Sequence, residues 1–154
     1  MGCLQKHYLL GAIIYMLAVA SSAEMSSAIF SIEQPQVLAT APGQHNSALY
    51  FHLNNQGNVL IEQVSVRSNE VAEIELHQTI MQDGQMQMRP VTKLSILPEQ
   101  SLVLEPNGLH FMLMGLKQQL KAGATLALTV CVLDDCQQIN AKIIHPMQHK
   151  AHHH

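Results

Sequence analysis

The sequence predicts an all-β fold, an antiparallel sandwich or barrel of about seven to nine short strands. Apolar and polar residues alternate along several short runs, turn residues separate these runs, and no segment keeps the 3.6-residue apolar period of a helix. The chain has 154 residues, 47% of them hydrophobic. That is enough for one domain with a core, and too apolar for a disordered chain.

The expected strands have apolar residues at alternate positions and end at turn sequences. Residues 49–53 form the first, and the polar turn at 54–58 should lead into 59–66 as its hairpin partner. Asp83-Gly84 is a strong hairpin turn signal, so the segments on either side of it should pair. The other expected strands are 72–76, 102–104, 109–114, 125–132 and 137–144.

The composition is low in ordinary charge. Asp, Glu, Lys and Arg make up 12% of the chain, against about 25% in a typical soluble domain. Histidine and methionine are abundant instead, with 10 and 9 copies, which together equal the 8 basic and 11 acidic residues. The net charge of −3 provides no electrostatic footprint for nucleic acid. The sequence marks out no nucleophile–base set, nucleotide-binding glycine loop or carboxylate pair, so we do not expect an enzyme.

The first 23 residues resemble a secretory signal peptide. A basic Lys6 precedes an apolar run at 8–20, which is shorter than the ~20 residues needed to span a bilayer, and small residues follow at 21–23. We expect cleavage after Ala23, with Ala20 as the second choice and an uncleaved membrane anchor as the alternative. The mature chain would then be exported to a bacterial periplasm, without stable membrane insertion.

Cys131 and Cys136 are the only cysteines of the expected mature chain. They flank 132–135, a plausible hairpin loop that would set them opposite each other on neighbouring strands. An oxidising compartment favours pairing them, so a disulfide is the first interpretation. An accessory metal or redox pair and two unpaired thiols are the alternatives.

Histidine and methionine gather on one face of the expected hairpin. Its turn sets Met81 opposite Met86 on that face. Further from the turn, Thr79 lies opposite Met88. His77 is diagonal to Met88, within reach of two long side chains that meet at a central atom.

His110, Met112 and Met114 also share one strand face, opposite a purely apolar side. Thioether sulfur is a soft ligand and imidazole a borderline one, a combination that suits Cu(I), whereas zinc favours thiolate, imidazole or carboxylate. The pattern therefore indicates a soft-metal site. The alternative is that the methionines fill gaps in the core and the histidines are polar surface. Glu73 and Glu75 flank the site and are interpreted as solvated or as a mild attraction for cations.

His77, Met88, His110 and Met112 follow the spacing H-x10-M-x21-H-x-M, which resembles the signature of the periplasmic copper chaperones called PCu(A)C. The flanking sequence is also similar, closely so over about residues 73–123. The resemblance implies a cupredoxin-like antiparallel β-sandwich or Greek-key barrel. It also implies that these four residues bind one Cu(I) near the surface.

The same resemblance implies a function in copper supply. The copper would serve assembly of the dinuclear centre of cytochrome c oxidase, or copper homeostasis more broadly. The partner would be a copper-accepting protein, either an oxidase copper subunit or an assembly factor, and we expect the chain to be a monomer. The rival functions are an electron-transfer cupredoxin-like copper protein and a metal-free β-sandwich interaction module.

Some candidate ligands lie outside this signature. Met86 and Met114 sit beside the four residues and are interpreted as apolar lining or as accessory ligands. The expected domain at 24–144 is followed by a His/Met-rich tail at 145–154, which could bind a second copper, Cu(II), or load the main site. The alternative is a polar tail that ends in a partial tag. The candidate ligands of the tail are His145, Met147 and His149.

Overall fold

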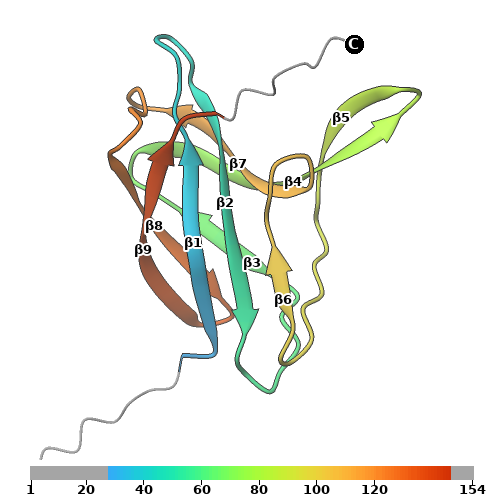
Figure 1. Cartoon of the computed structure of the whole chain (residues 1–154). Coiled ribbons are helices and arrows are strands. Elements are labelled where there is room, and N and C mark those ends of the chain that lie inside the picture. The colour runs from blue at the N-terminus through green and yellow to red at the C-terminus, as the bar shows by residue number, and fades with distance from the viewer. Residues whose placement is uncertain (1–27, 147–154) are drawn as a thin grey trace, which may run out of the picture.

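The computed structural model of the chain describes residues 28–146 (Figure 1). Within this range every named element is a β-strand, and no helix is long and apolar enough to span a membrane. The strands are β1 (Phe30–Leu38), β2 (Asn46–Asn55), β3 (Val64–Arg67), β4 (Val71–Gln82), β5 (Gln85–Pro90), β6 (Ser101–Val103), β7 (Leu109–Leu116), β8 (Thr125–Val132) and β9 (Asp135–Ile144).

The strands form one continuous, folded sheet. They hydrogen-bond in the order β3-β8-β9-β1-β2-β7-β4-β5, with β6 added to β2. Neighbours are antiparallel except β1 and β9, which run parallel. The sheet folds over on itself into two layers (Figure 1), and β3 contacts β4 without joining it in the strand order. The predicted all-β sandwich is confirmed. The described sheet does not close into a barrel, because β3 and β4 are not neighbours in the hydrogen-bonded strand order.

The core lies between the two layers and consists of the inward side of the alternating strands. Leu49, Phe51 and Leu53 of β2 are at most 1% exposed, as their alternation predicts. Phe51 stacks on Phe111 of β7, with ring centroids 5.7 Å apart. Burying a side chain of this size contributes about 1.5–3 kcal/mol. Because side chains alternate, the opposite face of β7 is left for its histidine and methionines.

The predicted hairpin between 49–53 and 59–66 is wrong. β2 pairs with β1, β6 and β7, whereas β3 pairs with β8. The reason lies in the loop after β2. Asn55 is buried, and its side-chain amide donates hydrogen bonds to the carbonyl oxygens of Val59 and Ile96, at 2.8 and 3.0 Å. This polar anchor holds the chain in a wide loop instead of a tight turn, so β3 reaches a different neighbour.

The sequence patterns also indicate no strand at 30–38, where the structure has β1. Pro35 and the polar residues Gln34 and Gln36 interrupt the alternation of apolar and polar residues there. The strand accommodates the proline through a β-bulge: its register with β2 shifts between Glu33 and Gln36, and Gln34 has a φ of 50°. Within sheets, proline is confined to edges, strand starts and bulges, so the irregular sequence marks the bulge.

Cys131 and Cys136 lie opposite each other in the β8–β9 hairpin. They are direct register partners with Cα atoms 4.1 Å apart, and they form a disulfide. The connecting loop is shorter than the expected 132–135, because Val132 already pairs with Asp135. Since the two sulfurs are bonded to each other, neither is a thiolate ligand for a metal.

Candidate metal centre

The β4–β5 hairpin projects from the sandwich and supplies one wall of the candidate site (Figure 1). Its turn, Asp83-Gly84, has positive φ at both residues, 52° and 75°, as a type I′ turn requires. Met81 lies opposite Met86. Further from the turn, Thr79 lies opposite Met88. The predicted register of this hairpin is confirmed.

Strand β7 lies on the other side of β4 and completes the site. His110 pairs directly opposite His77, and Met112 opposite Glu75. Directly paired residues point to the same face of a sheet, so both histidines, Met112 and Met88 share one face of β5, β4 and β7. The imidazole centroids are 6.3 Å apart, with the rings inclined at 65°. The structure thus brings the four residues of the spacing pattern to one face.

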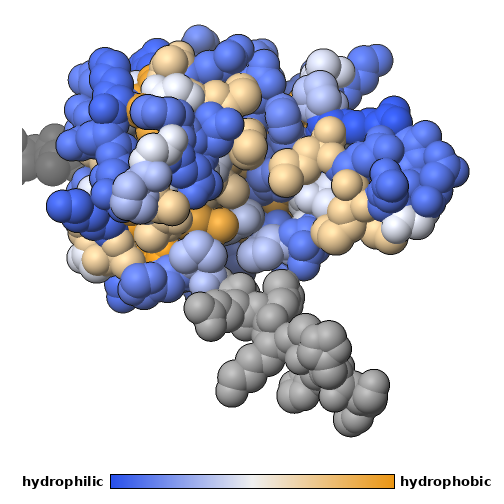
Figure 2. Space-filling view, turned by 90° about the horizontal axis from the view of Figure 1, so that it is seen from above, coloured by the Kyte–Doolittle hydropathy of each residue, from blue (hydrophilic) through white to orange (hydrophobic). Residues whose placement is uncertain are grey.

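An open cavity of about 550 Å³ lies between the hairpin and the body of the sandwich. Met86, Met88, His110 and Met112 are among its lining residues. Figure 2 shows the hollow beside the projecting hairpin, with hydrophobic side chains on the side of the hairpin that faces the body. A metal ion held here would be accessible to a second protein.

His110 is arranged as a neutral ligand. It is only 3% exposed, and its Nδ1 lies 3.1 Å from the carbonyl oxygen of Gly108. A carbonyl can only accept, so Nδ1 carries the proton and Nε2 keeps its lone pair. Burial lowers the pKa of His110; the hydrogen bond to Gly108 opposes this effect, and the charge of nearby His77 adds to it. His110 therefore offers a neutral nitrogen donor at neutral pH.

The two ring nitrogens of His77 have unlike surroundings. Nε2 lies 3.0 Å from Oε2 of Glu75, two residues earlier on the same strand face. Nδ1 is buried and has no hydrogen-bond partner in the described part of the chain. Because the carboxylate accepts the Nε2 proton, the lone pair of the neutral ring lies on Nδ1. An unsatisfied buried group costs about 1–3 kcal/mol, and a carboxylate behind the ring is a common partner of metal-binding histidine. Nδ1 is therefore the atom that a metal would bind.

The separation of the two imidazole rings is compatible with one ion between them. A metal lies about 2.0–2.1 Å from an imidazole nitrogen, hence roughly 3 Å from the ring centre. Two rings that flank one ion then have centroids roughly 5–6.5 Å apart, and the observed 6.3 Å lies in that range. Within residues 28–146 no group of three or more His, Cys, Asp or Glu side chains could hold a metal. The thioethers of Met88 and Met112 lie on the same face as this pair, and sulfur ligation favours a soft ion such as Cu(I).

The site is closed on the histidine side and open on the hairpin side. The side chain of His77 is 15% exposed, whereas Met88 is 58% exposed and Met112 is partly buried. Imidazole and thioether bind without a thiolate, and an exposed thioether can be displaced by an incoming ligand. The arrangement suits the binding and release of a soft ion.

The sequence patterns did not predict the roles of two side chains of the site. Glu75 is the hydrogen-bond partner of His77, and Tyr50 lies beside His110. The Tyr50 and His110 ring centroids are 6.3 Å apart, and burial raises the pKa of Tyr50, so its phenol stays protonated. The alternation of side chains along a strand could have predicted the positions of both residues. Glu75 lies two residues from His77, and Tyr50 stands between two inward-facing residues of β2, so it points outward.

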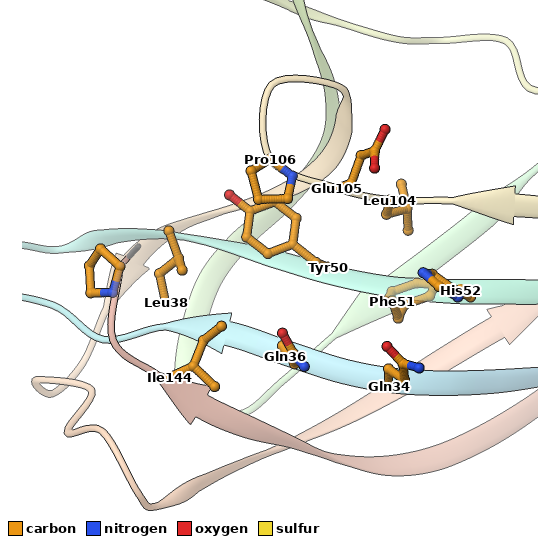
Figure 3. A pocket seen from close by; sticks show the side chains of 11 residues that line it. Gln34, Gln36, Leu38, Tyr50, Phe51, His52, Leu104, Glu105, Pro106 and Ile144 are labelled. Carbon is orange, nitrogen blue, oxygen red and sulfur yellow. The ribbon is translucent and has the colours of Figure 1, made fainter. Parts of the chain in front are cut away.

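Tyr50 also borders a second pocket, of about 240 Å³ (Figure 3). The walls of this pocket include Leu38, Leu104 and Ile144, and its one imidazole belongs to His52. Because none of its lining residues carries sulfur, this pocket lacks the ligand set of the first.

The accessory candidates are placed differently from one another. Met86 lines the cavity, whereas Met114, opposite Glu73, is not among the lining residues. His145 is exposed at the end of the described range. Outside the described residues lie the predicted signal peptide at 1–23 and, in the tail, Met147 and His149.

A family model described as "Putative lipoprotein LpqE-like" matches residues 30–143. Among curated relatives, "Putative lipoprotein Lxx21020" of Leifsonia xyli subsp. xyli (strain CTCB07) is 32% identical over 91 residues, which cover 58% of this chain and 55% of that protein. "Uncharacterized protein RP573" of Rickettsia prowazekii (strain Madrid E) is 34% identical over 100 residues, which cover 64% and 55%. The chain thus spans about half the length of the curated relatives it matches.

Solved structures with a similar fold include copper-binding domains. The copper-bound PCuAC domain from PmoF2 has a TM-score of 0.65 at 18% identity, covering 77% of this chain and 94% of that domain. Apo-DR1885 from Deinococcus radiodurans has a TM-score of 0.60 at 26% identity, covering 96% and 98%. Its Cu(I) form has a TM-score of 0.59 at 26% identity, covering 83% and 85%. The predicted cupredoxin-like fold is confirmed.

Proposed function

This chain belongs to the LpqE-like family, which is related to PCuAC domains, and on that premise we propose that it is a Cu(I) chaperone. It binds one cuprous ion with His77, Met88, His110 and Met112. The observation that carries the proposal is the buried Nδ1 of His77, which has no hydrogen-bond partner among residues 28–146. This nitrogen belongs to a ring that lies opposite a second neutral imidazole, on a face that also carries thioethers.

Related structures support copper as the ion. The PmoF2 domain is copper-bound, and DR1885 is known in both an apo and a Cu(I) form. We extend copper binding to this chain because its own ligands are two neutral nitrogens and two thioether sulfurs. This set is soft enough for Cu(I) and lacks the oxygen or thiolate ligands that harder ions recruit.

Release of the ion follows from the unequal exposure of the ligands. The two imidazoles are held in place by hydrogen bonds to Gly108 and Glu75, while Met88 is exposed. A thiolate or imidazole of the acceptor enters the coordination shell from the open side, and Met88 leaves. Copper stays in the same oxidation state, so direction depends on the relative affinities of the two proteins and on their docking. The chain needs no catalytic step, in keeping with a carrier and not an enzyme.

The destination of the copper is the finer part of the proposal. We place the chain in the periplasm, where it supplies copper for the dinuclear centre of cytochrome c oxidase or for copper homeostasis. The lipoprotein names of the family and of the Leifsonia xyli relative support export, and the disulfide between Cys131 and Cys136 is typical of an oxidising compartment. The acceptor is an oxidase copper subunit or an assembly factor, and the chain acts as a monomer.

The electron-transfer alternative has less support. A blue-copper site needs a cysteine thiolate beside two histidines. Both cysteines of the described domain are consumed by the disulfide. A second copper, Cu(II), in the tail remains a separate prediction, because two of its three candidate ligands lie outside the described residues.

X-ray absorption of the Cu(I)-loaded mature protein tests the proposal. We expect mixed nitrogen and sulfur scattering, and a weaker sulfur component in the Met88→Ala/Met112→Ala variant. Met114→Ala is the matched control, because Met114 lies on the same strand as Met112 but does not line the cavity. A sulfur component of undiminished amplitude in the double variant would contradict this ligand set.

A further inference from the structure

The β4–β5 hairpin has two unlike faces. One face carries Met81, Met86 and Met88, which are 68%, 58% and 58% exposed. On the other face the guanidinium of Arg89 donates a hydrogen bond to the side-chain oxygen of Gln82. A single exposed apolar residue needs no explanation, but three exposed methionines on one side of a hairpin with a mostly polar reverse side do.

The register places the three methionines at neighbouring positions on one face. A two-residue turn puts Gln82 and Gln85 in a hydrogen-bonded pair, so Met81 and Met86 form the next pair, with Cα atoms typically about 4.5 Å apart. Met88 follows Met86 by two residues on the same face. Because a methionine side chain has three rotatable bonds, these thioethers can converge on one point without backbone movement.

We propose that Met81, Met86 and Met88 form a second Cu(I) site, the outer site, beside the inner site at the two histidines. Three neutral thioethers suit the soft cuprous ion and disfavour zinc, magnesium and calcium, which recruit nitrogen, oxygen or thiolate ligands. None of the three ligands has to lose a proton to bind. Their exposure lets a copper donor reach the sulfurs directly.

The outer site adjoins the inner one. Met86 and Met88 line the same cavity as His110 and Met112, so Met88 is within the reach of both sites. Transfer of copper from the outer site to the inner site rests on the proposed function. A cuprous ion moves inward by exchanging Met81 and Met86 for the imidazoles and Met112, while Met88 stays bound. Copper remains Cu(I), only neutral ligands are exchanged, and no electron or proton is transferred.

Methionine methyl NMR resolves the two sites. The full chain, labelled with 13C at its methionine methyl groups, is titrated with Cu(I) without oxygen and, in parallel, with the redox-inert soft ion Ag(I). We expect the first equivalent to shift the signals of Met88 and Met112. Excess metal should then shift those of Met81 and Met86. The signal of Met147 reports separately on the tail.

Leucine substitutions on the hairpin identify the ligands. Met81→Leu/Met86→Leu should bind the first equivalent as the original chain does, and lose the further response of the Met88 signal to excess metal. Leucine keeps the size and apolarity of methionine without its sulfur, and both positions are exposed, so the fold should be unchanged. Met114→Leu is the matched control and should keep both responses, because its side chain does not line the cavity.

Different NMR results would contradict the outer site and the inner site. Met81 and Met86 signals that do not move with excess of either ion would overturn the outer site, and so would a second Met88 response that survives in Met81→Leu/Met86→Leu. Failure of the proposed function has another signature, in which the Met112 methyl signal stays unshifted whether or not the signals of Met81 and Met86 move.

Discussion

The candidate site joins two regions that are built in opposite ways. The first, which we term the histidine floor, is His77 and His110 on the paired strands β4 and β7. It is largely buried, and each ring is oriented by one hydrogen bond, to Glu75 or to Gly108. The second, the methionine hairpin, is 81–88, which projects at the edge of the sheet with its sulfurs exposed.

This difference matches the two tasks of a carrier. A fixed pair of neutral nitrogens supplies geometry and selectivity without reorganisation when the ion arrives. Flexible, exposed thioethers adapt to the ion and give way to a competing ligand. Substitutions in the floor should therefore reduce both metal binding and stability, whereas substitutions in the hairpin should reduce metal binding alone.

His110→Ala should have the largest effect. It removes a ligand, so Cu(I) affinity should fall by more than the about 10–100-fold that loss of an outer partner costs. It also removes the hydrogen bond to the Gly108 carbonyl and leaves a cavity beside the core. The free energy of unfolding should therefore fall by about 1–3 kcal/mol. Competition with a Cu(I) chelator and urea unfolding measure the two losses. Unchanged affinity in a folded variant would contradict the role of His110.

Met88→Leu should separate the two regions. We expect a large loss of Cu(I) affinity, because a sulfur ligand is removed. The unfolding free energy should stay within about 0.5 kcal/mol of the original, since the residue is mostly exposed. The same chelator competition and urea unfolding apply. A stability loss as large as that of His110→Ala would show that the hairpin is part of the core and not a separate region.

Glu75→Ala tests how the floor is oriented. The carboxylate fixes the proton of His77 on Nε2, so its removal frees the ring and should lower Cu(I) affinity by about 10–100-fold. Nitrogen NMR of the His77 ring should show the loss of one preferred tautomer, a change that a purely structural role would not produce. Glu73→Ala, on the same strand face, is the control and should leave both readouts unchanged.

The pH dependence of the metal-free protein should show the smallest effect. Burial lowers the pKa of His110 in the folded state, whereas an unfolded histidine titrates near about 6.5. Its contribution to stability is therefore full above about pH 6.5 and is lost as the pH falls below that value, because the unfolded chain then binds more protons. Cu(I) affinity should fall in the same direction, since protons compete for the imidazoles.

Urea unfolding between pH 7.5 and pH 5 checks this slope. The decline should be shallower in His110→Ala, which has no imidazole to titrate at that position. Equal slopes in the two proteins would exclude His110 as the source.

Much of the site could be predicted because its information is local. The turn at Asp83-Gly84 sets the register of β4 and β5, and this places Met81 opposite Met86 whatever surrounds the hairpin. The inward positions of β2 follow from alternation in the same way. The failures have non-local causes. The buried Asn55 redirects the chain after β2, and the bulge at Pro35 hides β1 from a search for alternation.

By itself, the sequence determined the face on which each candidate ligand lies and the register within the β4–β5 hairpin, because side-chain alternation and turn conformation act over a few residues. Only the tertiary structure decided that β7 pairs with β4, which sets His110 opposite His77. It also decided that one ring nitrogen of His77 is buried without a partner in the described range, while Glu75 holds the other. The physical reason is that strand partners far apart in the chain are chosen by the burial of the whole sheet. Local sequence patterns do not contain that information.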